Sequence, residues 1–475
     1  MANIANFYAN SSSTDSDAIQ AFFTAVGVGQ TDSILYFEPG QGRGPSGRYI
    51  IDRKLEFVGS AVIGFDLQQS TMRFTTPQSQ IVYTAIKGPA TTTIGPEHFF
   101  VRNGRVQYSA VIDNLFKWNF PYRDSRASGT GFVEKLRITP QDTAQAHQCQ
   151  APLHIKNTWN FVIRDVDYIG KPLQQSALVT DSCFLRQEGL SVVTVLDNCH
   201  SSYTDKAVVP VFSPLTAVNG TFTSGGYARD KTVRQGSVIG FFGRGTSLPN
   251  PTGLTYALYD VAGGAFVNGP ADLIDSAGNV IGSFNITATQ VYTDPPQALQ
   301  ICNGSTFITT NHLLSFTTPA NALGVKYLDI TMTDTHCAPY NSILTIDGVA
   351  ALTVGSGCFL TPLGTNNTSI SVTNGDIISI NNAQVTADNA NPNNANGKTW
   401  VKLRNVNGAT VSNNQIFFHQ HPVDIDNSVH DAVFAMNANF GTGGIVSAAT
   451  PFSTGNPHGP RFYGNGAMGI GVDII

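Results

Sequence analysis

Apolar and polar residues alternate with a period of two along most of this 475-residue chain. The stretch "LHIKNTWNFVIRDVDYIG" at 153–170 is typical, because apolar residues stand at every second position and Asn and Asp recur among the others. Such alternation indicates strands that bury one face. Comparable short segments follow one another to the C-terminal part, separated by Gly, Asn, Asp and Pro. The pattern predicts a protein built from many short strands.

One helix is predicted, in "TDSDAIQAFFTAVG" near the N-terminus. Its apolar residues recur at helical spacing and are Ala18, Ile19, Phe22, Phe23 and Val26. Asp15 or Ser16 can cap its first turn, and Gly27 follows its end. After this helix the period changes to two, and "SILYFEPG" reads as a strand that runs into a Pro-Gly turn.

Two distant stretches align as an internal repeat, "LHIKNTWNFVIRD" at 153–165 and "VKLRNVNGATVSN" at 401–413. The matched pairs are Asn157 with Asn405, Ile163 with Val411, and Asp165 with Asn413. A second match, "LHIKN" at 153 with "ALVTD" at 177, suits one coil of three strands. Asn tolerates the left-handed backbone conformation, and stacked Asn amides can hydrogen-bond from coil to coil. The spacing favours a solenoid, with a β-sandwich as the alternative.

The chain divides into a short cap, a long body and a tail. We expect an N-terminal cap and first coil in 1–60, a solenoid body in 61–430, and a Gly-rich C-terminal cap or assembly region in 431–475. The segment 205–300 is richer in Gly and Pro and contains the hairpin-like "DSAGNV". We interpret 205–300 as an insertion or an elaborated set of coils.

Composition restricts the class of protein. Only 12% of residues are charged although 41% are hydrophobic, so the surface of a folded chain must be covered with neutral polar side chains, which suits sugar hydroxyls. The net charge of −5 and the lack of a basic cluster argue against a nucleic-acid partner. Six Cys without CxxC pairs indicate buried free thiols. No apolar run reaches the roughly 20 residues of a membrane helix, and the start lacks the basic and apolar regions of a signal peptide. We therefore expect synthesis in a cytoplasm.

The N-terminal helix and the stretch "DSILYFEPGQGRGPSGRYII" that follows it resemble the opening of pectate-lyase-like right-handed parallel β-helix proteins. The residues that carry the resemblance are those of an "AIQ" helix, a strand ending in Pro-Gly and a "YxI" strand, namely Ala18, Ile19, Gln20, Phe37, Pro39, Gly40, Tyr49 and Ile51. "NFVIRDVDYIG" and "ATVSNNQIFF" resemble the interior coils of that superfamily. Together with the low charge and the Asn-, Thr- and Gly-rich coils, the chain looks most like a bacteriophage tailspike. The implied fold is all-β, a right-handed parallel β-helix with a short N-terminal capping helix.

The resemblance also implies a function. Tailspikes are homotrimers on the virion tail, and they bind a bacterial surface polysaccharide (exopolysaccharide, capsule or O-antigen) and usually depolymerise it. The chain departs from the pattern in having little room before Asp15 for a separate particle-binding domain. We therefore expect attachment through a short N-terminal peptide or through another phage tail or baseplate protein. No membrane insertion and no cofactor are expected.

Cleavage of a glycosidic bond needs two carboxyl groups, one acting as acid and the other as base or nucleophile. A lyase needs instead a base and a group that neutralises charge. Outward side chains of neighbouring coils can supply such a pair. The candidate catalytic acids are Asp165, Asp167, Glu188, Asp197, Asp329 and Asp334. Any one of them can equally be a turn-capping or solvated acid.

Asp167 with Glu188 is the preferred pair, because Asp167 is expected to point outward beside Arg164 with Glu188 one coil away. The inward residues of the same stretch should be Phe161, Ile163, Val166 and Tyr168. Candidate substrate-binding residues are Arg164, His200, Trp159 and Tyr203, and Trp118 is a further aromatic residue that either stacks on sugar or packs in the core.

"FFHQHPVDID" at 417–426 has two His two apart followed by Asp424 and Asp426, which is a weak metal signature, and no metal site is predicted. No GxSxG, Walker A or dinucleotide motif is present. The sequence thus predicts a tailspike-like polysaccharide depolymerase, a hydrolase or a lyase. The alternatives are a receptor-binding fibre without catalysis and a free-standing pectate-lyase-like enzyme.

Overall fold

The computed structural model covers the cap, the body and part of the tail. The residues that it describes are 2–29, 33–59, 61–85, 98–120, 129–142, 147–171, 178–189, 191–226, 231–245, 254, 256–275, 278–294, 296–320, 328–363, 368–386, 399–417, 421–426, 428–440, 446–448, 461–463 and 466–467.

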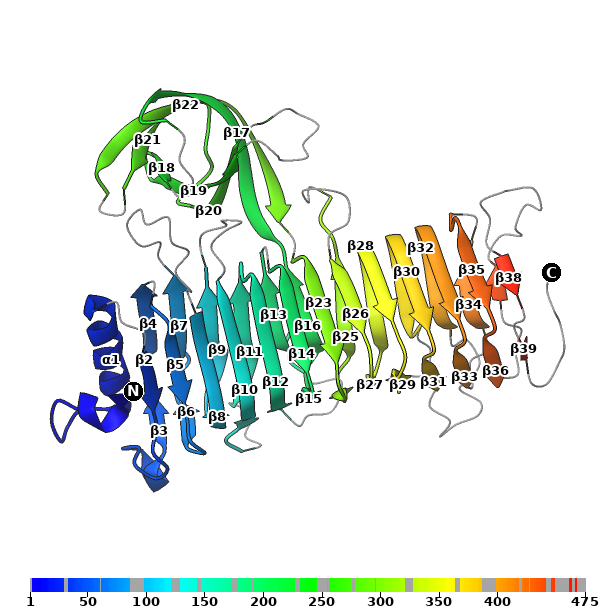
Figure 1. The fold of residues 1–475 in the computed structure, drawn as a ribbon, viewed down its shortest axis with the longest axis horizontal. Coiled ribbons are helices and arrows are strands. Elements are labelled where there is room, and N and C mark those ends of the chain that lie inside the picture. Colours follow the sequence, from blue (N-terminus) through cyan, green and yellow to red (C-terminus); the bar gives the residue numbers. More distant parts are fainter. Residues whose placement is uncertain are drawn as a thin grey trace.

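Outside 213–294, the described strands pair in parallel and stack into a shaft with three faces (Figure 1). The first face consists of β1 (Ala2–Asn3), β2 (Ser33–Tyr36), β5 (Ile63–Asp66), the N-terminal halves of β8 (His98–Tyr108), β10 (Thr130–Pro140) and β12 (Asn160–Ile169), then β14 (Val193–Asp197), β23 (Ala298–Cys302), β26 (Asp329–Met332), the C-terminal halves of β28 (Ser342–Val354), β30 (Ile370–Asn381) and β32 (Thr399–Ser412), β35 (Ala432–Ala435) and β38 (Arg461–Tyr463).

The second face consists of β3 (Tyr49–Ile51), β6 (Thr71–Phe74), the C-terminal halves of β8, β10 and β12, then β15 (His200–Ser202), β24 (Ser305–Ile308), β27 (Thr335–Ala338), β29 (Phe359–Leu360), β31 (Gln384–Thr386), β33 (Gln415–Phe417), β36 (Ala438–Phe440) and β39 (Gly466–Ala467). The third face consists of β4 (Lys54–Gly59), β7 (Gln80–Ala85), β9 (Val111–Asn119), β11 (Gln148–Lys156), β13 (Cys183–Glu188), β16 (Lys206–Val211), β25 (His312–Thr317), the N-terminal halves of β28, β30 and β32, then β34 (His421–Ile425) and β37 (Val446–Ala448). This arrangement is a parallel β-helix, as predicted.

The corners between faces are formed by residues with a positive φ. At the corner from the first to the second face these include Asn103, Asp165, Asn198, Asn303, Asp334 and Asn413, with φ between 46° and 60°. Asn and Asp adopt this conformation at little cost, and their side chains can bond locally. Asn198 Nδ2 donates to Asp165 Oδ1 of the preceding coil at 2.7 Å, and at another corner Asn405 Nδ2 donates to Asn374 Oδ1 at 3.2 Å. The predicted coil-to-coil bonding of Asn is confirmed.

The repeat read from the sequence is confirmed in one case and wrong in the other. Asn157 and Asn405 both form the corner from the third to the first face, with φ of 54° and 51°. The match of 153 with 177 is wrong, because Leu153 pairs with Leu185, a shift of 32 residues. The described residues 178–182 form the turn that precedes β13, so the coil is longer than the local similarity indicated.

The core fills the interior of the shaft with inward side chains from all three faces. The four residues predicted to point inward in β12, which are Phe161, Ile163, Val166 and Tyr168, are all buried. Aromatic rings pack along the N-terminal coils, with Tyr83 stacked on Phe99 and Trp118 edge-on to Phe161. Trp118 is fully buried and donates its Nε1–H to the Phe99 carbonyl at 2.8 Å, so it is a core residue and cannot stack on sugar. All six Cys are free, as predicted, and all but the half-buried Cys302 are buried.

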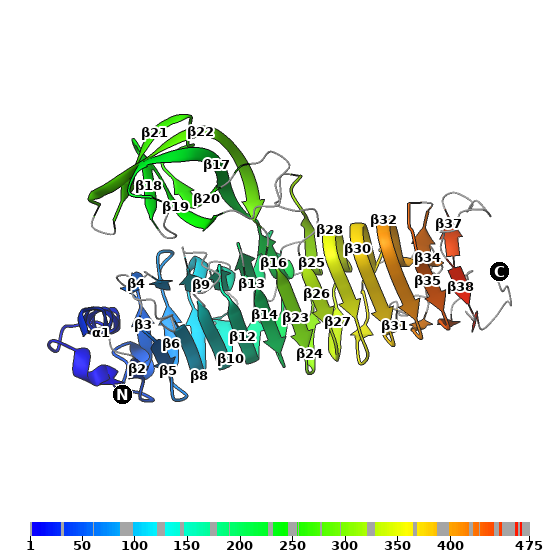
Figure 2. The same ribbon diagram turned by 45° about the horizontal axis from the view of Figure 1, so that its top comes forward.

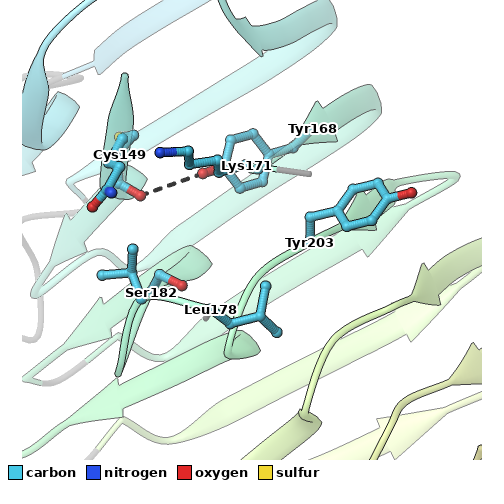
Figure 3. Close-up of a pocket in the computed structure, with 9 residues that line it drawn as sticks. Cys149, Tyr168, Lys171, Leu178, Ser182 and Tyr203 are labelled. Carbon is cyan, nitrogen blue, oxygen red and sulfur yellow. Dashed lines mark hydrogen bonds between the residues drawn. The ribbon is translucent and has the colours of Figure 1, made fainter. Parts of the chain in front are cut away.

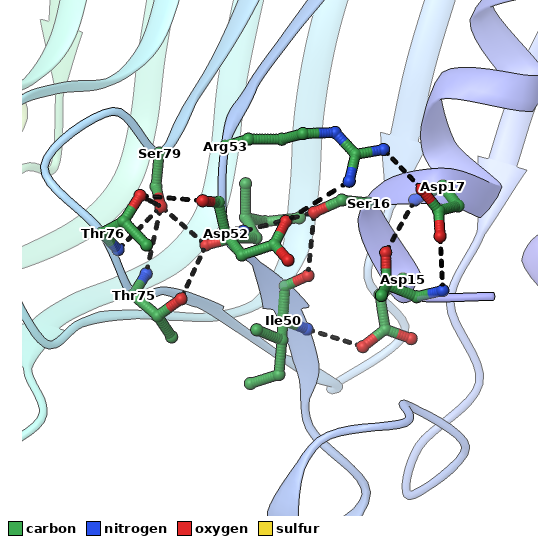
Figure 4. Close-up of polar contacts among 11 residues, drawn as sticks. Asp15, Ser16, Asp17, Ile50, Asp52, Arg53, Thr75, Thr76 and Ser79 are labelled. Atoms are coloured by element: carbon green, nitrogen blue, oxygen red, sulfur yellow. Dashed lines mark hydrogen bonds and ion pairs between the residues drawn. The ribbon is translucent and has the colours of Figure 1, made fainter. Parts of the chain in front are cut away.

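Helix α1 (Asp15–Gly29) covers the N-terminal end of the core (Figure 1). The five apolar residues predicted for its inner face are all buried. Its N-cap is Thr14, because Asp17 N–H donates to Thr14 Oγ1 and Thr14 N–H donates to Asp17 Oδ2. The predicted cap at Asp15 or Ser16 is therefore wrong. These two side chains instead bind the first coil: Asp15 accepts from the Ile50 N–H at 2.7 Å, and Ser16 Oγ accepts from the Asp52 N–H at 3.2 Å (Figure 4).

A closed antiparallel barrel interrupts the shaft between β16 and β23. Its strands are β17 (Ser213–Ser224), β18 (Thr232–Gln235), β19 (Val238–Gly245), β20 (Tyr256–Ala262), β21 (Gly269–Ile274) and β22 (Val280–Asp294). It has its own core, in which Phe222, Phe242, Tyr256 and Phe284 pack together. The barrel stands beside the N-terminal half of the shaft (Figures 1 and 2). The segment 205–300 thus holds the barrel, but β16 and β23 at its ends belong to the shaft.

The described strands after residue 430 continue the shaft. Val433 pairs with Arg461, and Ala438 pairs with Gly466, both in parallel. The body therefore extends past the predicted boundary at 430. None of the helices in the described residues is long and apolar enough to cross a membrane.

Two adjacent positions in β12 test the inward–outward alternation. Ile163 is fully buried, and Val162 points to the opposite side and is half-buried. We expect Ile163→Asn to lower the free energy of unfolding by about 3–5 kcal/mol, because it removes buried apolar volume and buries an amide. Val162→Asn should cost less than about 1 kcal/mol. Urea denaturation followed by circular dichroism measures both, and equal losses would contradict the register.

Candidate functional site

Five charged residues form a column on the outer side of the first face, each one strand from the next. Each follows a fully buried core residue in the sequence. They occupy equivalent positions on β5, β8, β10, β12 and β14 and are, in this order, Asp66, Arg102, Glu134, Arg164 and Asp197. The sign of charge therefore alternates along the column. Arg102 pairs with Asp66 at 2.9 Å, and Arg164 pairs with Asp197 at 2.7 Å. We call this set the charged column.

Asp197, the last member of the charged column, is held by two hydrogen bonds. Its Oδ2 accepts from Arg164 Nε, and its Oδ1 accepts from Asn303 Nδ2 at 2.8 Å. The Arg164 hydrogen bond, joined by that of Asn303, lowers the pKa of Asp197. Asp197 is therefore a carboxylate at neutral pH, suited to orient water or to stabilise positive charge. The same bond raises the pKa of Arg164.

Two predicted acids stand at the corner itself, directly beside the charged column. Asp165 has a φ of 54° and accepts from Asn198 of the next coil. Asp334 has a φ of 46° at the same corner three coils after Asp165, past the end of the charged column. Both therefore have a structural reason to be Asp, because the bend requires a residue that tolerates the left-handed conformation. Their carboxylates still add negative charge to this edge of the shaft.

Asp167 lies past the corner, on the second face. It pairs with Arg137 at 3.4 Å, and its neighbours across the sheet are Arg137 on one side and His200 on the other. Asp167 was predicted to stand beside Arg164. This is wrong, because the bend at Asp165 places Arg164 on the first face and Asp167 on the second. His200 is exposed, so Asp167, Arg137 and His200 form an open polar row around the corner from the charged column.

Glu188 lies on the third face, at the corner that leads to the first face, so it cannot pair with Asp167 on the second face. The sequence missed this because it gave no register. Glu188 accepts from His154 Nε2 at 2.7 Å and from Ser213 Oγ at 3.0 Å, and it pairs with Lys156 at 3.2 Å. Although burial opposes it, these donors hold the pKa of Glu188 far below its usual range. Glu188 is therefore an ionised carboxylate at neutral pH and is not suited to act as a general acid.

Asp329 is the first residue of β26, at the opposite end of the first face from the corner at Asp334. Burial raises the pKa of Asp329. Its neighbours across the sheet are Ala298 and Ala351, so the positions beside it offer no second acid. Asp329 and Asp334 are five residues apart along one strand direction and do not form a pair.

The predicted aromatic residues are at two other corners. Trp159 is 41% exposed at the corner from the third to the first face. Tyr203 has a φ of 60° and lines a small pocket at the corner from the second to the third face, with Cys149, Tyr168, Lys171, Leu178 and Ser182 (Figure 3). Tyr168 in this pocket donates its hydroxyl to the Cys149 carbonyl at 3.5 Å. Both aromatics remain available for sugar contacts, but the structure does not bring them to the charged column.

Both acids of the "HQHPVDID" stretch are engaged by one arginine. Arg404 pairs with Asp424 at 2.7 Å and with Asp426 at 3.1 Å. His419 is outside the described residues. In the part of the chain that the structure describes, no three His, Cys, Asp or Glu side chains gather as metal ligands.

Sequence reasoning missed Glu134 and Arg137, and also Lys117, His154 and Arg186 on the third face. A usable signal existed for the charged column, because each of Arg102, Glu134, Arg164 and Asp197 directly precedes a corner residue with positive φ. Aligning the residue before each corner would have found them. The third-face residues carry no such mark.

Comparisons with known proteins define the fold. No family model matches the chain, and no curated protein matches it. Among solved structures, tailspike protein 3 of bacteriophage CBA120 matches 100% of this chain with a TM-score of 0.50 and 9% identity, and the match spans only 62% of that chain. The A-module of the mannuronan C-5 epimerase AlgE6 from Azotobacter vinelandii matches 98% of this chain and 99% of its own, with a TM-score of 0.39 and 11% identity. DFA-IIIase from Arthrobacter chlorophenolicus, without its lid, matches 91% and 93%, with a TM-score of 0.31 and 9% identity. The fold is a tailspike-like parallel β-helix.

The low pKa of Glu188 predicts a pH-dependent contribution to stability. A carboxyl whose folded pKa is depressed stabilises the fold above its unfolded pKa of about 4.3, and this stabilisation is lost as the pH falls through the folded value. We expect Glu188→Gln to lower the free energy of unfolding by about 1–3 kcal/mol at pH 7. The deficit should shrink below about pH 4, where the wild type begins to lose the same contribution.

Urea midpoints at pH 7 and pH 3 measure this effect. The matched control is Asp113→Asn, because Asp113 is 67% exposed in its ion pair with Arg186 and should change stability by less than about 1 kcal/mol. A Glu188→Gln deficit that stays constant over this pH range would show that the ionised form does not matter.

Proposed function

We propose that this protein is a tailspike-like depolymerase that binds and cleaves a bacterial surface polysaccharide. The observation that carries the proposal is the placement of Glu134 and Asp197 on the outer side of the first face, with Arg164 on the strand between them. Two strand spacings separate their backbones by ~9.6 Å. Rotation of the two side chains about their single bonds can bring the carboxyl groups into the range of about 6.5–9.5 Å that separates those of inverting glycosidases. The sequence predicted a catalytic pair formed by Asp167 and Glu188. We propose Glu134 and Asp197 instead of that pair.

The proposed roles follow from charge. Asp197 is held as a carboxylate by Arg164 and Asn303, so it acts as the base that removes a proton from the attacking water. Glu134 is the second carboxyl of the pair and is 28% exposed. It takes the remaining role, that of the acid that protonates the leaving sugar oxygen. Water attacks the anomeric carbon, the glycosidic bond breaks, and the leaving oxygen takes the proton of Glu134. Asp165, Asp167 and His200 provide hydrogen-bonding groups for neighbouring sugars along the edge.

A non-catalytic receptor-binding fibre is the second candidate. The observation in its favour is that the carboxylates of the charged column already have partners: Asp66 with Arg102, Glu134 with Lys135, and Asp197 with Arg164. Paired acids can serve as fixed hydrogen-bond acceptors for sugar hydroxyls without any transfer of protons. The proposal of cleavage therefore depends on a direct measurement.

Cleavage is tested with Glu134→Gln and Asp197→Asn on host surface polysaccharide. We expect each substitution to lower the rate of formation of new reducing ends by ~10²-fold or more, with binding retained, because general acid–base groups contribute by this amount. Absorbance of an unsaturated uronate, followed in parallel, distinguishes a lyase from a hydrolase.

The matched control is Asp347→Asn. Asp347 is also an acid beside a corner and accepts from Asn374 Nδ2 at 2.6 Å, but it belongs to the corner between the third and first faces. Its turnover should equal that of the wild type. Full turnover in both test variants would show that Glu134 and Asp197 are not the catalytic pair. Binding without any turnover in the wild type would favour the receptor-binding fibre.

The proposed assembly is a homotrimer on a phage tail, attached through a short N-terminal peptide or another tail or baseplate protein. Stacked coils pair their strand edges with each other everywhere except at the two ends of the shaft, which favours high resistance to unfolding. Sedimentation equilibrium should give three times the mass of one chain. A monomer over the micromolar range would contradict this assembly.

A further inference from the structure

A second polar cluster, on the outer side of the third face, is separate from the charged column. Lys117 of β9, His154 of β11 and Arg186 of β13 occupy equivalent positions on three neighbouring strands. Lys156 and Glu188 stand two residues further along β11 and β13, beside the point where the barrel begins, and Ser213 of the barrel donates to Glu188. We call Lys117, His154 and Arg186 the basic row.

The basic row is not neutralised by the acids around it. Glu188 is already bound by His154, Lys156 and Ser213, and Asp113 is the partner of Arg186 at 3.2 Å. With His154 neutral, the net charge of this region is +1, from the three cations Lys117, Lys156 and Arg186 and the two anions Glu188 and Asp113. Among the described residues, Lys117 makes no hydrogen bond or ion pair, although it is partly buried. An ammonium held in this way is short of an anionic partner.

His154 adds an unpartnered hydrogen-bond acceptor to the basic row. It is only 5% exposed, and its Nδ1 has no hydrogen-bond partner. Because the ionised Glu188 only accepts, His154 Nε2 must carry the proton that it donates. Burial lowers the pKa of His154, so the ring is neutral and Nδ1 presents a bare lone pair. That atom requires a donor such as a hydroxyl.

Lys117 and Arg186 need an anion, and His154 Nδ1 needs a hydroxyl donor. We propose that the basic row is a binding subsite for an acidic, hydroxyl-bearing sugar of the bound polysaccharide, with the anionic group on Lys117 and Arg186 and a hydroxyl donating to His154. Identifying the ligand as part of a polysaccharide rests on the proposed function. The anionic group is a carboxylate or a phosphate, since both accept charge-assisted hydrogen bonds from Lys and Arg.

The subsite is tested with small probes whose charge and hydroxyls differ. Ligand-observed saturation-transfer NMR gives the affinities of the wild-type protein for glucuronate, glucose 6-phosphate, glucose and acetate. We expect the two charged sugars to bind about tenfold or more tightly than glucose, because of the charge-assisted bonds. The stronger of the two identifies the anionic group. Glucuronate should also exceed acetate, which has no hydroxyl for His154.

Variants assign the binding to the basic row. Lys117→Met should lower the affinity for both charged sugars about tenfold or more, and Arg186→Met should do the same. His154→Phe should abolish the preference for glucuronate over acetate. Lys206→Met is the matched control, because Lys206 is another third-face lysine whose partner is Asp181. Melting curves of every variant establish that it is folded. Lys117→Met changes a residue that is less buried than His154, and it keeps the test valid if His154→Phe unfolds.

The subsite is contradicted if the charged sugars bind no better than glucose. It is also contradicted if they bind Lys117→Met as tightly as they bind the wild type. Turnover of a polysaccharide by a protein that shows no charge preference would retain the depolymerase and remove the subsite. Charged-sugar binding that depends on Lys117 in a protein without turnover would retain the subsite and remove cleavage.

Discussion

The hydrogen bond from a corner side chain to the next coil is the interaction on which the rest of this structure depends. Asn198 donates to Asp165, and Asn374 donates to Asp347 at a different corner. In both cases the donor residue has a positive φ, so the bend and the bond between coils are provided by one side chain. Because strand side chains alternate with a period of two, a slip of one residue would turn the whole core face outward. The corner bonds oppose such a slip, and every outward column inherits its register from them.

This constraint explains why corner acids are poor evidence of chemistry. Asp165 and Asp334 are residues that the backbone favours at these positions, because Asp and Asn adopt the left-handed conformation more readily than most residues. Glu134 and Asp197 stand one residue before a corner, where the backbone is ordinary and imposes no such choice. A carboxylate at those two positions therefore needs another reason, which is either pairing within the charged column or contact with a ligand. That difference, rather than the number of acids nearby, is what singles them out.

The same logic separates what the sequence predicts from what it cannot. Alternation alone predicts inward residues such as Ile163 and Val166, because burial depends only on the period of two. Corner residues such as Asn157 and Asn405 are also recognisable, since their conformation restricts the residue type. Partners across coils are not predictable in this way. Glu134, Arg164, Asp197 and Cys302 occupy one column, yet they are separated by 30, 33 and 105 residues. Connections at the corners absorb these differences without disturbing the stack, so Asp167 and Glu188, close in sequence, lie on different faces.

The barrel shows how a chain with few charges uses them. A solenoid offers only long repetitive faces, and an insertion at a corner can add a second domain because the strands before and after it, β16 and β23, still continue the stack. At that junction the chain collects Lys156, Glu188 and His154 in a buried network that includes Ser213 of the barrel. A buried ion pair brings little net stability, because desolvation offsets the attraction between the charges. Stability alone therefore does not account for further cations beside it. Arg186 is paired with Asp113, and Lys117 adds one positive charge to a network that was already balanced around Glu188. This excess charge fits a surface that positions an acidic ligand better than one that only fastens the barrel.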